Sequence, residues 1–250
     1  MNRFDEYKRL FGNVDGWFDD VAACVFDCLL DYQEEEKISG DFLEIGIWKG
    51  KSAGLAALHC QPEEKCLFID ALSLEEAKEN VSKAVPGATC EYLQEFSQCL
   101  ARYPFLNERV RTFRWIHVDG EHTSQAVVND LDVVDRLLSG RGVVVVDDFF
   151  ANSYPQVTQG VFQFLASRPS RLTLFLCGFR KGYLCRPRAA REYLQYVHNS
   201  LHADVTARGC EELTLWKTTE PADMNTFGIT PGYRGLKYRG PDWDDKNIHI

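Results

Sequence analysis

The sequence predicts an α/β fold in which helices wind around a mainly parallel sheet. Between residues 41 and 148, short apolar runs alternate with segments of helical length, which is typical of βαβ units around a buried parallel sheet. A glycine-bounded loop follows the first run, and three later runs end in carboxylates. In an open parallel sheet, ligands bind outside the carboxyl ends of the strands. We therefore expect one large α/β domain with a ligand site at that edge.

The composition fits a globular protein that handles a small molecule. The chain has 250 residues, of which 45% are hydrophobic, and its net charge is −9. A negative charge disfavours binding to a nucleic-acid backbone. No apolar run approaches the roughly 20 residues of a membrane helix, and the N-terminus lacks the apolar core of a signal peptide. We expect a cytoplasmic protein with no nucleic-acid or membrane partner; a homodimer stays an open option.

Nine cysteines are scattered along the chain, most of them inside apolar segments, and no C-x-x-C occurs. An odd number without metal-ligand spacing predicts neither a disulfide framework nor a zinc site. We expect reduced cysteines that pack as small hydrophobic residues.

Residues 1–37 are predicted to be helical. Apolar residues recur every three or four positions over residues 17–32, which indicates a helix with one buried stripe. Asp15 is the expected N-cap, with Asp19 and Asp20 in the first turn. Gly40 separates this helix from the first strand.

Residues 41–148 supply the alternating elements. The expected strands are residues 42–47, 65–70, 89–93, 114–119 and 143–148. The helices expected between and after them are residues 51–59, 74–85, 96–103, 124–138 and 157–167, with a turn at 140–142.

The C-terminal third departs from this alternation. Residues 172–177 and 181–186 predict an antiparallel hairpin at one edge of the sheet, followed by a helix over 187–201 and a strand over 212–218. The tail from Pro221 shows no periodicity, and we expect it to be irregular. We divide the chain into an N-terminal helical segment (1–40), a core (41–186) and an extension of the same domain (187–250), which is a candidate lid or dimer arm.

The glycine loop predicts a nucleotide-like ligand. Gly46 and Gly50 lack a Cβ and allow a ligand to approach the backbone, and the helix behind them offers free N–H groups. The spacing is G-x-x-x-G, which any strand–helix turn can also show. Asp70, at the end of the second strand, lies where an acid accepts hydrogen bonds from a ribose; the alternative is that it caps a local turn. Glu44, inside the first strand, suits a backbone or ligand amine contact.

The ends of the fourth and fifth strands bring further carboxylates together. Asp119 ends one strand, and Asp147 and Asp148 end its expected neighbour. Three carboxylates without a cationic partner repel one another, and a hard divalent cation such as Mg²⁺ relieves that repulsion. His122 lies one short turn past Asp119 and is a candidate base or substrate contact. The alternative is that Asp148 caps the next segment and His122 begins a helix.

These residues together carry a family resemblance. The runs Glu-Ile-Gly-x-x-x-Gly-x-Ser at 44–52, Ile-His-Val-Asp-Gly-Glu-His at 116–122 and Gly-x-Val-Val-Val-Asp-Asp at 142–148 resemble class I S-adenosylmethionine-dependent methyltransferases. Within that class they look like the metal-dependent small-molecule branch of catechol and macrocin-type sugar O-methyltransferases. Gly16-Trp17 and Tyr154-Pro155 also match that branch, so that the resemblance covers roughly residues 12–186.

The resemblance implies a Rossmann-like, doubly wound, seven-stranded sheet whose strand ends bind S-adenosylmethionine, so that residues 41–186 form the cofactor-binding core. It places the methionine side of the cofactor against Glu44, Gly46, Gly50 and Ser52, the ribose on Asp70, and the adenine near Ser97. Asp119, Asp147 and Asp148 match the metal-ligand positions, and Asp119 also borders the cofactor. Asp119 and His122 then become the catalytic candidates, and the cation activates a hydroxyl for attack on the sulfonium methyl group.

One departure bears on the substrate. Asp148 stands where catechol enzymes carry Asn, and sugar O-methyltransferases have an acid there, which favours a sugar, polyketide or other natural product. Three alternatives stay open. A nicotinamide-dependent oxidoreductase shares the loop and Asp70 but lacks G-x-G-x-x-G and leaves Asp147-Asp148 unexplained. A metal-dependent hydroxylase or hydrolase, and a non-catalytic binding subunit, are each compatible with the same fold.

Overall fold

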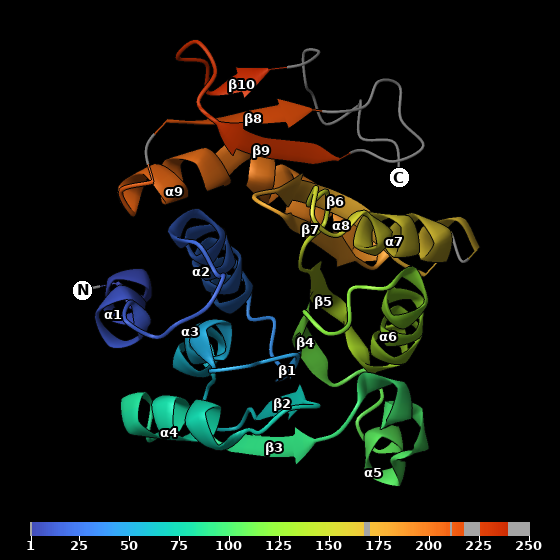
Figure 1. Ribbon diagram of the computed structural model, residues 1–250. Coiled ribbons are helices and arrows are strands. Elements are labelled where there is room, and N and C mark those ends of the chain that lie inside the picture. The colour runs from blue at the N-terminus through green and yellow to red at the C-terminus, as the bar shows by residue number, and fades with distance from the viewer. Residues whose placement is uncertain (1, 168–170, 211, 218–225, 240–250) are drawn as a thin grey trace.

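The computed structural model describes residues 2–167, 171–210, 212–217 and 226–239, and their strands form one mixed sheet (Figure 1). The strand order is β10-β8-β9-β6-β7-β5-β4-β1-β2-β3. The strands are β1 (Asp41–Ile45), β2 (Cys66–Asp70), β3 (Cys90–Gln94), β4 (Phe113–Val118), β5 (Leu138–Val146), β6 (Thr173–Gly178), β7 (Lys181–Cys185), β8 (Leu213–Lys217), β9 (Phe227–Pro231) and β10 (Tyr238–Arg239).

Two of the described helices precede β1, others follow each of the first five strands in turn, and the last ones follow the hairpin of β6 and β7. They are α1 (Arg3–Phe11), α2 (Asp20–Glu35), α3 (Lys51–His59), α4 (Glu75–Ala84), the 3₁₀ turn η1 (Ser97–Arg102), α5 (Pro104–Asn107), α6 (Ser124–Leu137), α7 (Pro155–Ser167), α8 (Pro187–Tyr196), the π-helical η2 (Val197–Leu201) and α9 (His202–Ala207). This alternation confirms the predicted α/β class.

The first five strands are parallel, as predicted. Strand β1 pairs with β2 and β4, β2 pairs with β3, and β4 pairs with β5, all in the same direction. Strand β7 then runs antiparallel to both β5 and β6, which confirms the hairpin. Because the five strands share one direction, their carboxyl ends meet at one edge, where the site lies.

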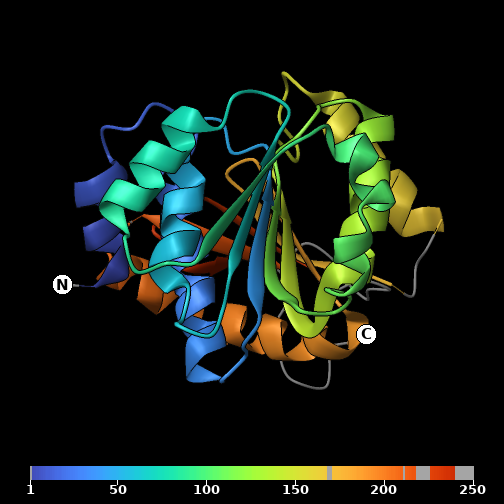
Figure 2. The same cartoon turned by 90° about the horizontal axis from the view of Figure 1, so that it is seen from below.

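Two layers of helices cover the sheet (Figure 2). Helices α1 to α4 lie on one face, and α6 and α7 lie on the other. Alternate strand residues feed the two layers: Phe42 and Trp115 belong to the core under the first layer, whereas Leu43 and Ile116 belong to the core under the second. Both faces of the parallel strands are thus buried, which explains their continuous apolar runs.

Local details differ from three expectations. Helix α2 begins one turn later than predicted, and its N-cap is Asp19, whose side chain accepts a hydrogen bond from the Ala22 N–H; Asp15 is instead paired with Lys49. The glycines at 140 and 142 do not form a turn, because both lie within β5. Helix α5 follows η1 and was not predicted; Pro104 begins it at a position that suits proline.

The C-terminal extension enlarges the sheet beyond the seven strands that the resemblance implies. Strand β8 was predicted, but β9 and β10 fall in the tail that we expected to be irregular. Strand β9 pairs in parallel with β6 and antiparallel with β8, so the sheet continues past the hairpin. The rest of that tail, residues 218–225 and 240–250, lies outside the described residues.

Two expectations about composition can be compared with the structure. All nine cysteines are free, which agrees with the prediction of reduced thiols. Among the described helices, none is both long enough and apolar enough to cross a membrane.

Candidate active site

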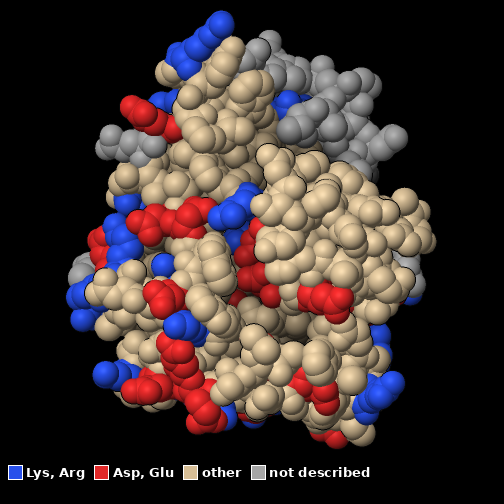
Figure 3. Space-filling model, in the orientation of Figure 1, with Lys and Arg blue, Asp and Glu red and all other residues tan. Residues whose placement is uncertain are grey.

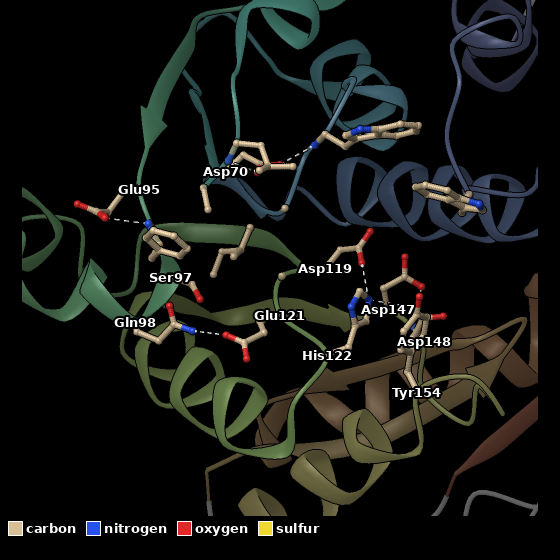
Figure 4. A pocket seen from close by; sticks show the side chains of 18 of the residues that line it. Asp70, Glu95, Ser97, Gln98, Asp119, Glu121, His122, Asp147, Asp148 and Tyr154 are labelled. Carbon is tan, nitrogen blue, oxygen red and sulfur yellow. Dashed lines mark hydrogen bonds and ion pairs between the residues drawn. The ribbon is translucent and has the colours of Figure 1, made fainter.

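A cavity of about 710 Å³ opens at the carboxyl ends of β1, β2, β4 and β5. Of the residues predicted for the site, the cavity is lined by Gly46, Asp70, Ser97, Asp119, His122, Asp147 and Asp148. Figure 4 shows Ser97 and Gln98 at one end and the Asp119–His122–Asp148 group at the other, with Asp70 above them. Strand ends far apart in sequence thus form one site.

The glycine loop is shaped mainly by packing against its neighbours. Gly46 has a φ of 86°, and a Cβ there would stand 1.9 Å from the carbonyl oxygen of Asp119. Gly50 has a φ of 82°, and its open side faces Ala77 and Val81 of α4. The Gly46 backbone lines the cavity, whereas Gly50 is not among the lining residues. Gly50 therefore lets α3 and α4 pack closely.

Glu44 and Ser52 lie beneath the cavity and support it. The Ser52 hydroxyl donates a hydrogen bond to Glu44 Oε1, and that same oxygen lies 2.9 Å from Nδ1 of His117. All three side chains are buried. Burial opposes the charge on His117, but the Glu44 carboxylate outweighs burial and raises the pKa of the imidazole. Glu44 thus connects the glycine loop to β4.

The end near Asp70 suits a nucleoside. Asp70 Oδ2 accepts from the Trp48 N–H and Oδ1 accepts from the Leu72 N–H, each over 2.8 Å. The acid therefore does cap a local turn, and it also lines the cavity. Leu72 and Phe96 line the cavity too and are largely exposed, so that they offer apolar contacts to a flat ring. Ser97 adds a hydroxyl beside them.

The opposite end carries an imidazole between two carboxylates. His122 Nε2 lies 3.0 Å from Asp148 Oδ2 and 3.8 Å from Asp119 Oδ1. These two acids raise the pKa of His122 to about 10, while burial of the ring opposes them in part. Burial and the nearby charge of Asp147 raise the pKa of Asp119 above its usual value. Tyr154 stacks on the His122 ring, with centroids 4.1 Å apart, and holds it in place.

Asp147 faces a cation that the motifs did not reveal. Its Oδ1 is paired with the ammonium of Lys181, which is 2% exposed, and also accepts from the Asp148 N–H over 2.6 Å. Burial opposes ionisation of Asp147, but Lys181 and His117 prevail and lower its pKa to about 2. Asp147 Oδ2 lies 3.8 Å from His117 Nε2. The expectation that the three acids lack a cationic partner was therefore wrong for Asp147.

Potential metal ligands form two overlapping groups that share Asp119. One contains His117, Asp119 and Asp147, and the other contains Asp119, His122 and Asp148; within each group the ligand atoms lie within 4.8 Å of one another. The three predicted carboxylates are therefore neighbours, and each group adds a histidine. A third group, Asp31 with Glu34 and His59, lies away from the cavity and is balanced by Arg3 and Arg208.

Further lining residues were not assigned to the site from sequence. Trp17 reaches the cavity from the segment before α2, is 76% exposed, and stacks on Trp48 of the glycine loop at 4.6 Å. Gln98 donates to Glu121 over 2.7 Å and closes the nucleoside end. Arg180 lines the cavity from the hairpin turn. The Gly16-Trp17 and Tyr154-Pro155 pairs were visible signals, whereas nothing in the pattern singled out Arg180.

Comparison with known proteins gives a family match and a viral relative. Residues 43–149 match a family model described as a methyltransferase domain. An uncharacterized protein, R132, of Acanthamoeba polyphaga mimivirus is 26% identical over 137 residues; the match covers 52% of this chain and 62% of the viral protein. The chain thus spans less than two thirds of that relative.

Solved structures that share this fold include methyltransferases. CalS11, a TDP-rhamnose 3'-O-methyltransferase of calicheamicin biosynthesis, is 14% identical with a TM-score of 0.51, over 73% of this chain and 92% of its own. MycE of mycinamycin biosynthesis, solved with Mg and SAH, is 14% identical with a TM-score of 0.55, over 74% and 55%. TomG from Streptomyces achromogenes, solved with SAM, is 18% identical with a TM-score of 0.51, over 74% and 88%. At these identities the likeness shows the fold.

Proposed function

We propose that this chain is a class I methyltransferase that transfers the methyl group of S-adenosylmethionine to a hydroxyl oxygen of a small molecule, assisted by a divalent cation. The observation that carries the proposal is one cavity with a nucleoside-type end at Asp70 and an acid–imidazole group at Asp119, His122 and Asp148. The two ends suit a methyl donor and a hydroxyl acceptor.

We assign the donor to the end that contains Asp70. Its carboxylate is held by two backbone N–H groups, and the remaining lone pairs are free to accept the ribose hydroxyls. Leu72 and Phe96 would contact the faces of the adenine, and Ser97 its edge. The methionine part would lie along Gly46. Glu44, Gly50 and Ser52 act from beneath, because they shape the loop without lining the cavity.

We assign the acceptor to the group around His122. In the transfer an oxygen–carbon bond forms, the sulfur–carbon bond breaks, and the hydroxyl proton leaves. The protonated His122 ring lies where it can donate a hydrogen bond to the acceptor oxygen, and the Asp119 carboxylate beside it can take up the hydroxyl proton. Asp119 and Asp148 orient the imidazole from two sides. Stacking on Tyr154 fixes the ring plane. This arrangement holds the oxygen ready for attack.

The donor set fits a divalent cation bound at Asp119 and Asp148, with Asp147 Oδ2 and His122 beside it. Such a cation would supply positive charge that stabilises the oxyanion of the acceptor. Lys181 already neutralises the charge of Asp147. This favours a second version of the same activity, in which His122 and Lys181 supply the positive charge and no metal is needed. In both versions the protein belongs to the same enzyme class.

The test separates donor binding, transfer and metal dependence. Calorimetric titration with S-adenosylhomocysteine is expected to show one site, while NAD gives no heat of binding. Transfer of a labelled methyl group to a panel of sugars and polyketide alcohols is then measured with Mg²⁺ and with EDTA. Loss of transfer in EDTA and in Asp148→Ala, but not in Glu79→Gln on the exposed side of α4, supports the metal-assisted version. Transfer that survives EDTA leaves the methyltransferase and removes the metal.

A further inference from the structure

Arg180 presents a free positive charge to the acceptor end of the cavity. It lies in the two-residue turn between β6 and β7 and lines the cavity together with Asp147, Asp148 and Tyr154. Its side chain is exposed, and its guanidinium makes no hydrogen bond or ion pair with any residue that the structure describes. Its carbonyl oxygen accepts from the Phe149 N–H over 3.0 Å, which ties this turn to the end of β5.

Most of the charged residues around Arg180 in the cavity wall are acidic. The other charged lining residues, His122 apart, are carboxylates: Asp70, Glu95, Asp119, Glu121, Asp147 and Asp148. The two acids at the end of β5 that line the cavity with Arg180 already have cationic partners: Lys181 pairs with Asp147, and His122 pairs with Asp148. Figure 3 shows carboxylates gathered in the central hollow of this face with basic atoms at its border. Among the described residues that line the cavity, Arg180 is therefore the arginine or lysine whose charge is available to a ligand.

The backbone adds an independent sign that this arginine serves a ligand. Phe179 and Arg180 have φ values of 48° and 58°, as the type I′ turn of a two-residue hairpin requires. That turn strongly prefers Asn-Gly or a similar pair, because a larger side chain is strained at positive φ. An arginine there does not help the turn. Unfavourable backbone geometry of this kind tends to be kept where function requires the side chain.

We propose that Arg180 binds an anionic group of the acceptor, a carboxylate or a phosphate, so that the substrates are acidic hydroxyl compounds. The planar guanidinium donates two parallel hydrogen bonds to such a group. The six carboxylates along the cavity repel an anion from every other part of the wall, so the arginine also fixes which end of the acceptor faces His122. This inference rests on the proposed function, because it assigns the acceptor to the same cavity.

Binding to the protein saturated with S-adenosylhomocysteine tests the inference. The probes are two matched pairs: 3,4-dihydroxybenzoate with 3,4-dihydroxybenzyl alcohol, and glucose 6-phosphate with glucose. We expect the anionic member of at least one pair to bind at least about tenfold more tightly than its neutral partner. The pair that shows the difference identifies carboxylate or phosphate as the group. Equal affinities within both pairs, or no saturable binding of either anion, would overturn the inference.

Variants then assign the effect to one side chain. Arg180→Asn should abolish the preference for the anion and leave the neutral probe unaffected, and Arg180→Lys should keep part of it. Arg188→Gln, an exposed arginine of α8 outside the cavity, is the matched control and should bind as the parent does. An unchanged preference in Arg180→Asn, or its loss in Arg188→Gln, would contradict the assignment.

Stability separates ligand binding from a structural role. Asparagine tolerates positive φ better than arginine, so Arg180→Asn should keep or raise Tm while anion binding falls. A lower Tm together with weaker binding would make Arg180 a structural residue and overturn the inference. Failure of the proposed function would give a different result. In that case S-adenosylhomocysteine would not bind, or neither the parent nor the variant would methylate a neutral acceptor. The preference for the anion, by contrast, is measured by binding alone.

Discussion

Lys181 of β7 forms an ion pair with Asp147 at the end of β5, and the two side chains are only 2% and 12% exposed. The pair joins the antiparallel hairpin to the parallel half of the sheet at the floor of the cavity. As a result, Asp147 has a cation supplied by the protein, whereas Asp119 and Asp148 depend on His122. The charge balance of the site is therefore set by a strand outside the carboxylate motifs.

Replacing Lys181 should destabilise the fold. Lys181→Met leaves Asp147 buried without its partner, and the loss of one member of a buried pair costs about 3 kcal/mol or more of unfolding free energy. Urea denaturation of parent and variant measures the loss. Lys65→Met is the matched control, because Lys65 pairs with Glu91 at an exposed position, where an ion pair contributes at most about 1 kcal/mol.

The double variant Lys181→Met/Asp147→Asn sharpens that test. Removing the charge of Asp147 as well should recover most of the loss, because an uncompensated buried charge is the main cause. If Lys181→Met is as mild as Lys65→Met, the pair does not have the role that its burial indicates.

Gly46 should tolerate no side chain. A Cβ at this position would stand 1.9 Å from the Asp119 carbonyl oxygen, at a φ of 86°, so either the loop or the end of β4 must move. We expect Gly46→Ala to lose more than about 3 kcal/mol of unfolding free energy or to fail to fold. Gly87→Ala is the control, since no atom of the described residues lies within 4 Å of the place that a Cβ would take there. Similar melting temperatures for the two variants would contradict the close packing.

The outline of the fold follows from sequence because its signals are local. Apolar runs, glycine stops and helical spacing lie within each element, and they predicted β1 to β7 and most helices. The N-cap of α2 shows the limit: Asp15 and Asp19 both suit a cap, and only the packed path of residues 12–19 selects Asp19. In the tail, β9 forms against the edges of β6 and β8, and the two-residue strand β10 forms against β8, so the pattern that specifies them lies in other strands.

The site was predictable where function coincides with strand ends. Asp70, Asp119, Asp147 and Asp148 follow apolar runs, and the structure brings all four to one cavity. The pairing of Glu44 with His117 depends on the register between β1 and β4, which no local pattern fixes. Lys181 was equally hidden, because its partner lies more than thirty residues away in the chain.

Asp70 should be required for donor binding. Both of its oxygens accept backbone N–H groups, so Asp70→Asn places an amide N–H₂ against an N–H and removes the charge that would hold the ribose. We expect the Kd for S-adenosylhomocysteine to rise about ten- to a hundredfold, as measured by calorimetry. Asp41→Asn is the control: Asp41 also accepts a backbone N–H, from Lys65, but does not line the cavity. Equal affinity in both variants would remove Asp70 from the donor site.

Asp130 should make stability depend on pH. This carboxyl of α6 is 1% exposed, and neither oxygen accepts a hydrogen bond from the described residues. It lies beneath Gly120. Its pKa is raised to about 7, chiefly by burial, with the nearby Ser97 hydroxyl opposing this shift and the charge of Glu121 adding to it. The folded protein thus holds this proton more tightly than the unfolded chain, where the pKa is about 3.9.

The sign of the effect follows from this difference. The contribution of Asp130 to stability is greatest below pH about 4, where this carboxyl is protonated in both states, and it falls as the pH rises toward 7, because the unfolded chain ionises first. The loss between pH 4.5 and pH 8 should be about 3 kcal/mol. Asp130→Asn cannot ionise, so its stability relative to the parent should rise by that amount over the same range. Urea denaturation at both pH values measures the change, with Glu108→Gln as an exposed control. Parent and Asp130→Asn curves that stay parallel would show that Asp130 does not hold its proton in the folded state.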